Sequence, residues 1–206
     1  MTVPSTARLS REEKKARTRA QLLDAARNVF AERGFAGASL DEVAEEAGLT
    51  KGAVYSNFAN KEDLVLAVLE DQFNRRMDEA LSKVHFEGTI AEQAHVGGSI
   101  FMAQFEEDRW ADLLFLDFVT YAARNPEFRN RLAARHRETV TAIADVMVES
   151  SATRQWSLPM PADKLALVIN ALGNGLALEK LIDPDAVPDD LFGDAIALLW
   201  ANSTGP

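Results

Sequence analysis

Apolar residues recur along almost the whole chain at the three- and four-residue spacing of helices, and no convincing run alternates apolar and polar positions as a strand would. We therefore expect an all-α protein. The first predicted helix covers about residues 16–33 and ends before Gly34, at the position where a C-terminal cap often has glycine. Its apolar stripe consists of Leu22, Leu23, Ala26, Val29 and Phe30.

Two short helices are predicted next. Ser39 with Glu42 three residues later has the pattern of a capping box and begins the first short helix, which Gly48 ends. Thr50 can cap the second, over about residues 51–58. Two short helices joined by a turn that contains glycine indicate a helix-turn-helix.

The rest of the chain also has helical periodicity. Asn60 can cap a long helix over about 61–84, and a polar, proline-containing connection covers 150–161. The other predicted helices cover about 90–105, 108–124, 126–149, 162–182 and 189–201. We expect an N-terminal domain of three helices over 1–60, joined by the long helix to a helical domain over 61–206.

Composition narrows the class of protein. Apolar residues make up 47% of the chain, which is ample for a packed core. The absence of cysteine excludes disulfides, thiolate metal sites and cysteine nucleophiles. No apolar run approaches the roughly 20 residues that cross a bilayer, and the N-terminus has no apolar leader. These features predict a cytoplasmic protein without a membrane partner.

The net charge of -10 is unevenly distributed. Residues 1–60 contain nine lysines and arginines against eight acidic residues, so the acidity belongs to residues 61–206. A basic segment over 8–19 contains Arg8, Arg11, Lys14, Lys15, Arg17 and Arg19. A local basic stripe of this kind is typical of phosphate binding, whatever the total charge, although such segments are also common as solvated arms.

The N-terminal residues carry the most specific signal. They are Arg17, Thr18, Arg19, Leu23, Ala25, Ala26, Phe30, Gly34, Phe35, Ser39, Leu40, Val43, Ala44, Ala47, Gly48, Leu49, Thr50, Lys51, Gly52, Tyr55, Phe58, Lys61 and Leu64. In this order and spacing they resemble the TetR family of transcriptional repressors. The resemblance covers about residues 17–69, and the remaining chain matches in its helical layout only.

The resemblance implies that residues 50–58 form a recognition helix in the major groove. The implied DNA-contacting residues are Arg17, Arg19, Ser39, Thr50, Lys51, Gly52, Ala53, Tyr55, Ser56, Asn57 and Lys61. Ser39, Lys51, Tyr55 and Lys61 would bind phosphate. Ser56 and Asn57 would read bases, and many relatives have an aromatic residue or histidine there, so the base preference cannot be transferred. Val54 and Phe58 are expected in the core.

The second domain offers candidates for a ligand pocket and a dimer interface. The pocket candidates are Phe73, Met77, Phe101, Phe105, Trp110, Phe115, Phe118, Tyr121 and Met147, although aromatic stripes are more often core. The last two predicted helices are apolar almost all round. Their dimer candidates are Leu165, Ile169, Leu172, Gly173, Leu176, Phe192, Ile196 and Leu199, and an intramolecular core is the alternative.

Together these features predict a repressor that binds palindromic operator DNA as a homodimer and is released by an apolar or amphipathic small molecule. One alternative is a helical dimer that has lost DNA binding and acts through protein or small-molecule contacts. Another is an enzyme or carrier, which the absence of a Gly-rich phosphate loop and of a nucleophile elbow disfavours. No cofactor or metal is expected, since His85, His95 and His136 are dispersed.

Overall fold

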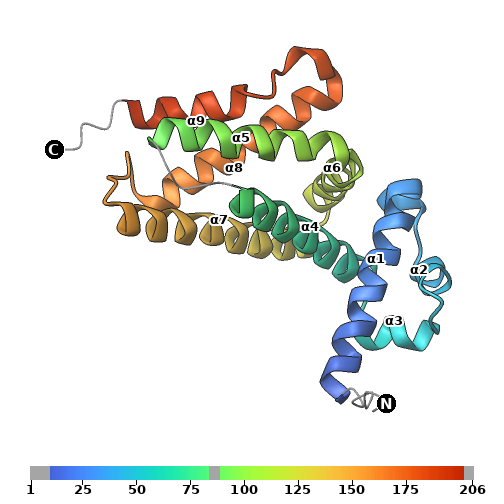
Figure 1. The fold of residues 1–206 in the computed structure, drawn as a ribbon. Helices are drawn as coiled ribbons and strands as arrows, with labels where there is room; N and C mark the ends of the chain where they lie inside the picture. Colours follow the sequence, from blue (N-terminus) through green and yellow to red (C-terminus); the bar gives the residue numbers. More distant parts are fainter. Residues whose placement is uncertain (1–9, 84–88, 202–206) are drawn as a thin grey trace, which may run out of the picture. The chain divides into compact units, whose positions relative to one another are not determined.

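The computed structural model describes residues 10–83 and 89–201, so Arg8 and His85 lie outside it. Over these ranges every regular element is a helix, which confirms the predicted all-α class (Figure 1). Contacts between Cα atoms divide the chain into two compact units, residues 1–71 and 72–206.

The first unit contains α1 (Arg11–Gly37), α2 (Leu40–Glu46), α3 (Lys51–Asn57) and the beginning of α4 (Lys61–Lys83). Helix α1 begins earlier than predicted. Ser10 caps it: the Ser10 hydroxyl accepts from the N–H of Glu13 at 3.1 Å, and the Glu13 carboxylate accepts from the N–H of Ser10 at 2.7 Å. The described basic residues from Arg11 to Arg19 are therefore helical.

Gly34 interrupts α1 near its end. Its φ of 64° lies in the left-handed region that favours glycine, so the predicted cap becomes a kink before a final turn. Phe35 in that turn is buried. The kink therefore turns Phe35 into the core while the chain moves toward α2.

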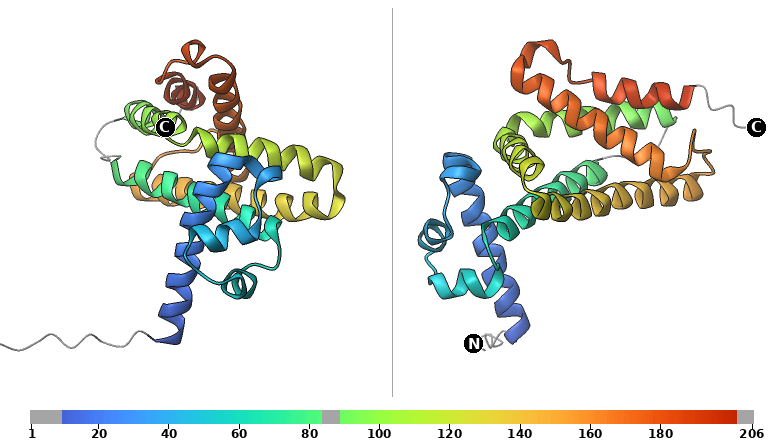
Figure 2. Two further views of the ribbon diagram at one scale, coloured as in Figure 1. Left: turned by 90° about the vertical axis from the view of Figure 1, so that its right-hand side faces the viewer. Right: turned by 180° about the vertical axis from the view of Figure 1, so that it is seen from behind.

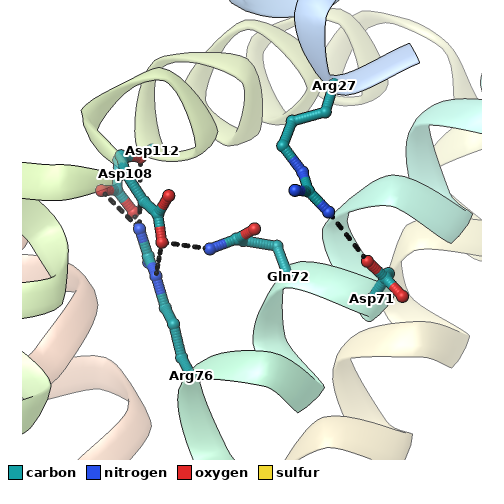
Figure 3. Close-up of polar contacts among 6 residues, drawn as sticks. All are labelled: Arg27, Asp71, Gln72, Arg76, Asp108 and Asp112. Carbon is teal, nitrogen blue, oxygen red and sulfur yellow. Dashed lines mark hydrogen bonds and ion pairs between the residues drawn. The ribbon is translucent and has the colours of Figure 1, made fainter. Parts of the chain in front are cut away.

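The division between the units falls within α4 rather than before it. Leu64, Val65 and Val68 in the first half of α4 are almost fully buried. Asp71 pairs with Arg27 of α1 at 3.3 Å, whereas the next residue, Gln72, donates to Asp108 in the second unit (Figure 3). Consecutive residues of one helix are thus bonded to different units.

The second unit comprises the rest of α4, α5 (Ile90–Glu107), α6 (Arg109–Arg124), α7 (Pro126–Arg154), α8 (Ala162–Ile182), the 3-10 turn η1 (Pro184–Ala186) and α9 (Leu191–Ala201). Helix α7 continues beyond the predicted residue 149. It ends at Gln155, which takes the left-handed conformation with φ 57° and whose N–H donates to the carbonyl of Ser151.

Helices α5 and α9 lie side by side and antiparallel (Figures 1 and 2). Their backbones meet at two glycines: a Cβ built on Gly98 would lie 2.4 Å from the Cα of Gly193. Beside this contact, His95 Nδ1 lies 3.0 Å from a carboxylate oxygen of Asp194. Any larger residue at either glycine would force the helices apart, so the close contact depends on these two positions.

The prediction that no apolar run is long enough to cross a membrane is wrong for α8. By length and composition alone, it is the one helix among the described residues that could do so. The core helix of a folded protein passes the same test. One side of α8 is indeed buried in the second unit, where Leu165, Ala166 and Ile169 pack against other helices.

Candidate nucleic-acid interface

The turn between α2 and α3 has the geometry of a helix-turn-helix. Gly48 has φ 63°, and the N–H of Leu49 donates to the carbonyl of Ala44 at 2.9 Å. Val43 of α2 and Val54 of α3 are fully buried, so the two helices share one small core. The turn and this core determine the angle between α2 and α3.

Helix α3 exposes one face and buries the other. Val54 and Phe58 are buried, as predicted. Tyr55 is 56% exposed, a high value for a large aromatic side chain. The exposed positions of α3 are Lys51, Gly52, Tyr55 and Ser56.

Ser56 and Asn57, the predicted base readers, turn back onto their own helix. The Ser56 hydroxyl and the Asn57 amide both donate to the carbonyl of Ala53, at 2.9 and 2.8 Å. The Asn57 side-chain oxygen is buried without a hydrogen-bond partner. In this conformation Asn57 does not present its amide outward, so any base reading by it requires another rotamer.

Ser39 is already engaged by Glu42. Its N–H and its hydroxyl both donate to one carboxylate oxygen of Glu42, at 2.9 and 2.8 Å, while the Ser39 hydroxyl accepts from the N–H of Glu42. Hydrogen bonding by Ser39 lowers the pKa of Glu42, and Arg33 also pairs with this carboxylate. The predicted capping box is confirmed. Its donors, however, are not free for phosphate.

Lys51 is likewise paired within the unit. Its ammonium lies 2.7 Å from a carboxylate oxygen of Asp41, in the first turn of α2. The Asp41 hydrogen bond and negative charge raise the pKa of Lys51. Both side chains are at least half exposed, so this ion pair lies on the surface.

The Lys61 side chain turns toward the end of α1. Its ammonium donates to the carbonyls of Phe35 and Ala38 at 2.7 and 3.0 Å, with a longer contact to Ala36 at 3.5 Å. It also lies 4.6 Å from the centre of the Phe35 ring. In the described structure Lys61 therefore joins the start of α4 to the end of α1, and its phosphate contact stays a prediction.

Four other residues predicted to contact DNA lie on α1 or at the start of α3. Arg17 is exposed on α1, whereas the Arg19 guanidinium is half-buried 4.6 Å over the ring of Phe58. Thr50 caps α3 by accepting from the N–H of Ala53 at 3.2 Å, as predicted. A Cβ built on Gly52 would lie 3.8 Å from the Thr50 hydroxyl oxygen, an ordinary contact, and Gly52 itself adds no bulk to the exposed face of α3.

The sequence interpretation missed the part played by the two acidic residues of α2. Asp41 and Glu42 hold two of the four predicted phosphate anchors. The capping-box spacing indicated the Glu42 contact. No spacing signal links Asp41 to Lys51, because their proximity arises from the crossing of α2 and α3.

In the second unit, the predicted pocket residues do not gather at one place. Phe101 and Phe105 belong to a core with Met102 and Phe192, whereas Phe73 and Met77 pack against Ile143, Ala144 and Ala166. Met147 packs against both clusters. Phe118 is fully buried beside Tyr121, and Trp110 and Phe115 are half-buried on α6.

A buried polar network lies beside this core (Figure 3). Arg76 of α4 is almost buried and pairs with Asp112 at 3.1 Å and with Asp108 at 3.7 Å. Its guanidinium also lies 4.6 Å from the centre of the Phe105 ring. Burial raises the pKa of Asp112, and Arg76 opposes that shift.

Gln104 lies on α5, one turn before Asp108, and is 4% exposed. Neither the nitrogen nor the oxygen of its side-chain amide has a hydrogen-bond partner. A buried amide without partners is costly, and neither its burial nor its lack of partners was evident from the sequence.

The predicted dimer residues are mostly internal. Leu165, Ile169, Gly173 and Phe192 are buried within the second unit, and Leu172, Leu176, Ile196 and Leu199 pack against the same core. The burial of these four residues agrees with the intramolecular alternative, and their place in a dimer interface stays a prediction. The exposed side of α8 instead presents Leu167, Ala171, Asn174, Gly175, Leu178 and Ile182, at intervals of three, four or one residues.

An exposed α3 held by a small core defines a DNA-binding protein of the helix-turn-helix class. Comparisons with known proteins agree. Residues 22–68 match the protein family described as "Bacterial regulatory proteins, tetR family". Residues 99–197 match the family described as "BetI-type transcriptional repressor, C-terminal". The transcriptional regulator TtgR of Pseudomonas putida is 29% identical over 195 residues, which cover 89% of this chain and 88% of TtgR.

Solved structures share the fold. A TetR-family regulator from Rhodococcus sp. has a TM-score of 0.73 and 20% identity, covering 92% of this chain and 100% of that one. FadR of Bacillus subtilis, solved in complex with stearoyl-CoA, has a TM-score of 0.66 and 16% identity, covering 90% and 99%. This chain belongs to the TetR family of bacterial regulatory proteins and is a transcriptional regulator rather than an enzyme.

The position of Lys61 leads to a stability prediction. Replacing Lys61 with Met removes its hydrogen bonds to the carbonyls around the end of α1, and we expect the free energy of unfolding to fall by about 1.5–3 kcal/mol. The matched control, Lys51→Met, breaks only a surface ion pair and should change it by about 1 kcal/mol or less. Urea unfolding followed by circular dichroism measures both. Equal effects of the two variants would contradict the structural position of Lys61.

Proposed function

We propose that this regulator is a cytoplasmic repressor that binds a palindromic operator as a homodimer and leaves it when a small molecule binds the second unit. The observation that carries the proposal is the exposed face of α3, on a helix whose opposite face is anchored by Val54 and Phe58. A helix held in this way can enter a major groove without rearrangement of its own core.

Three features support DNA contact by this face. Tyr55 projects an exposed phenol, which can donate to a phosphate oxygen. Gly52 has no side chain, which allows close approach to the groove. Arg17 adds an exposed cation on α1. In the proposed complex, phosphate contacts position the protein and Ser56 lies nearest to the bases.

The first test concerns Tyr55. We expect Tyr55→Phe to weaken operator binding about three- to tenfold, because one phosphate hydrogen bond is lost. Fluorescence anisotropy with DNA from upstream of the protein's own gene, measured over a series of salt concentrations, gives the affinity. The control variant is Tyr121→Phe, which changes the chain's other tyrosine, in the second unit, and should leave the operator affinity unchanged. Absence of any sequence-specific complex at physiological salt would contradict the proposed function.

A second copy of the chain is the proposed partner of α8. Its exposed face combines Leu167, Leu178 and Ile182 with the small residues Ala171 and Gly175 near the middle. A Cβ built on Gly175 would have open space around it within 4 Å. Small residues flanked by large apolar ones let two helices approach closely, and a two-fold axis pairs one such face with its copy. A palindromic operator requires two recognition helices related in the same way.

The corresponding variant is Leu178→Glu. It places a charge in the proposed interface, so we expect a protein of half the wild-type mass with a much lower operator affinity. Leu113→Glu is the matched control, since Leu113 is also exposed but lies on α6. Light scattering gives the mass. An unchanged mass for Leu178→Glu would argue against this face as the interface.

The second unit supports an amphipathic, uncharged ligand. Its core is rich in phenylalanine and methionine, and Gln104 contributes a buried amide that can both donate and accept. The buried cation Arg76 is already paired with Asp108 and Asp112, so it leaves little attraction for an anion. B. subtilis FadR, whose fold is similar, was solved with stearoyl-CoA, and only the long apolar chain of that ligand parallels the uncharged ligand proposed here, because its CoA part is anionic.

Release from DNA is proposed to act through α4. Asp71 bonds to α1 in the first unit, and the adjacent Gln72 bonds to Asp108 in the second. A ligand that alters the surroundings of Asp108 would therefore act on the helix that also carries Lys61. A coupling of about 1–3 kcal/mol between the two sites is typical of such regulation.

Gln104→Leu tests the ligand proposal. Without ligand, we expect the variant to be more stable by about 1–3 kcal/mol, because an unpaired buried amide is removed. Thermal unfolding is then measured with three probes of similar size: naphthalene, which has no polar group, 2-naphthol, which has a neutral hydroxyl, and 2-naphthoate, which has a carboxylate. In the wild type 2-naphthol should raise the Tm most, and in the variant it should act no better than naphthalene. A destabilised variant, or equal responses of the wild type to all three compounds, would contradict this.

A further inference from the structure

Two of the proposed DNA-contacting residues have carboxylate partners within the first unit. Ser39 donates to Glu42, and Lys51 donates to Asp41. Both acceptors are carboxylates, which resemble a phosphate in charge and in hydrogen-bonding geometry. A phosphate that approaches this surface must therefore replace a partner that is already bound.

The two carboxylates differ in what they contribute to the fold. Glu42 closes the cap of α2 and also pairs with Arg33, so it is tied into the structure. Asp41 takes no part in this capping box, and its carboxylate meets the Lys51 ammonium on the exposed surface. The Lys51 side chain is 68% exposed and the Asp41 side chain 50% exposed. Outside the capping box, the Asp41 carboxylate thus contacts an exposed cation of α3.

We propose that Asp41 limits the affinity of this protein for DNA by competing with phosphate for Lys51. The inference rests on the proposed DNA-binding function. An exposed ion pair is weak in water, so a phosphate can displace Asp41. The displaced carboxylate then stays close to the DNA, where it is repelled by the phosphates. Both effects reduce the affinity, and both decrease as salt screens the charges.

A limited affinity is useful to a regulator that a ligand must release. A ligand coupling of about 1–3 kcal/mol weakens binding only about 5- to 150-fold. An operator complex that is too tight would remain largely bound after such a change. In this interpretation Asp41 keeps the complex within the range that a ligand can dissociate.

The test is a double-mutant cycle on operator binding, measured by fluorescence anisotropy at low salt. We expect Asp41→Asn to strengthen binding about fivefold. This factor corresponds to the free energy of a surface ion pair at the upper end of its usual range. Glu45→Gln removes an exposed carboxylate from the same helix and is the control for the general effect of negative charge. It should strengthen binding less than twofold.

A Lys51→Met background distinguishes competition between Asp41 and phosphate for Lys51 from simple repulsion between Asp41 and the DNA. In a Lys51→Met background, Asp41→Asn should change the affinity no more than Glu45→Gln does, because there is no cation left to release. If Asp41→Asn equals Glu45→Gln in the wild-type background, keeps its full effect without Lys51, or weakens binding, the proposal is overturned. If the wild type forms no operator complex at all, the proposed function itself fails, which is a different result.

Discussion

The direction in which α3 presents its exposed side chains depends on the burial of three residues, Val43, Val54 and Phe58. The first two join α2 to α3, and the third closes the end of α3 beneath the Arg19 guanidinium. A short helix of this kind has little stability alone, so its orientation comes from packing. Lys61 extends the same arrangement to α4 by binding the carbonyls that follow the kink at Gly34. The DNA-binding surface is consequently a product of the core beneath it.

Charge on this surface is balanced locally. Lys51 and Ser39 have carboxylate partners, and Lys61 has carbonyl partners, so the free protein presents fewer open donors than its sequence contains. Tyr55 on α3 and Arg17 on α1 are exposed. Affinity for a polyanion depends on how many phosphates the protein neutralises, and each internal partner reduces that number unless it is displaced. In the proposed complex the acidic residues of α2 are therefore part of the DNA-binding chemistry even though they would repel DNA.

The second unit uses α8 on two sides. One side enters the core with α5 and α9, where Gly98 and Gly193 allow the backbones of these two helices to touch. The other side leaves Leu178 and Ile182 exposed. This double use explains why α8 is apolar almost all round without being buried all round. It also explains why α8 is long and apolar enough to cross a membrane although one of its sides belongs to the core.

The sequence by itself determined the helical class, the helix-turn-helix and the caps at Ser39 and Thr50, because periodicity and capping are local properties. It also distinguished Val54 and Phe58 as core from Tyr55 as surface. It could not determine which side of α8 is buried, since an apolar helix has no polar face to mark its orientation. Nor could it show that Lys61 turns inward, that Asp41 meets Lys51, or that Gln104 is buried without a partner. Each of these depends on residues brought together from different helices, so only the tertiary structure decided them.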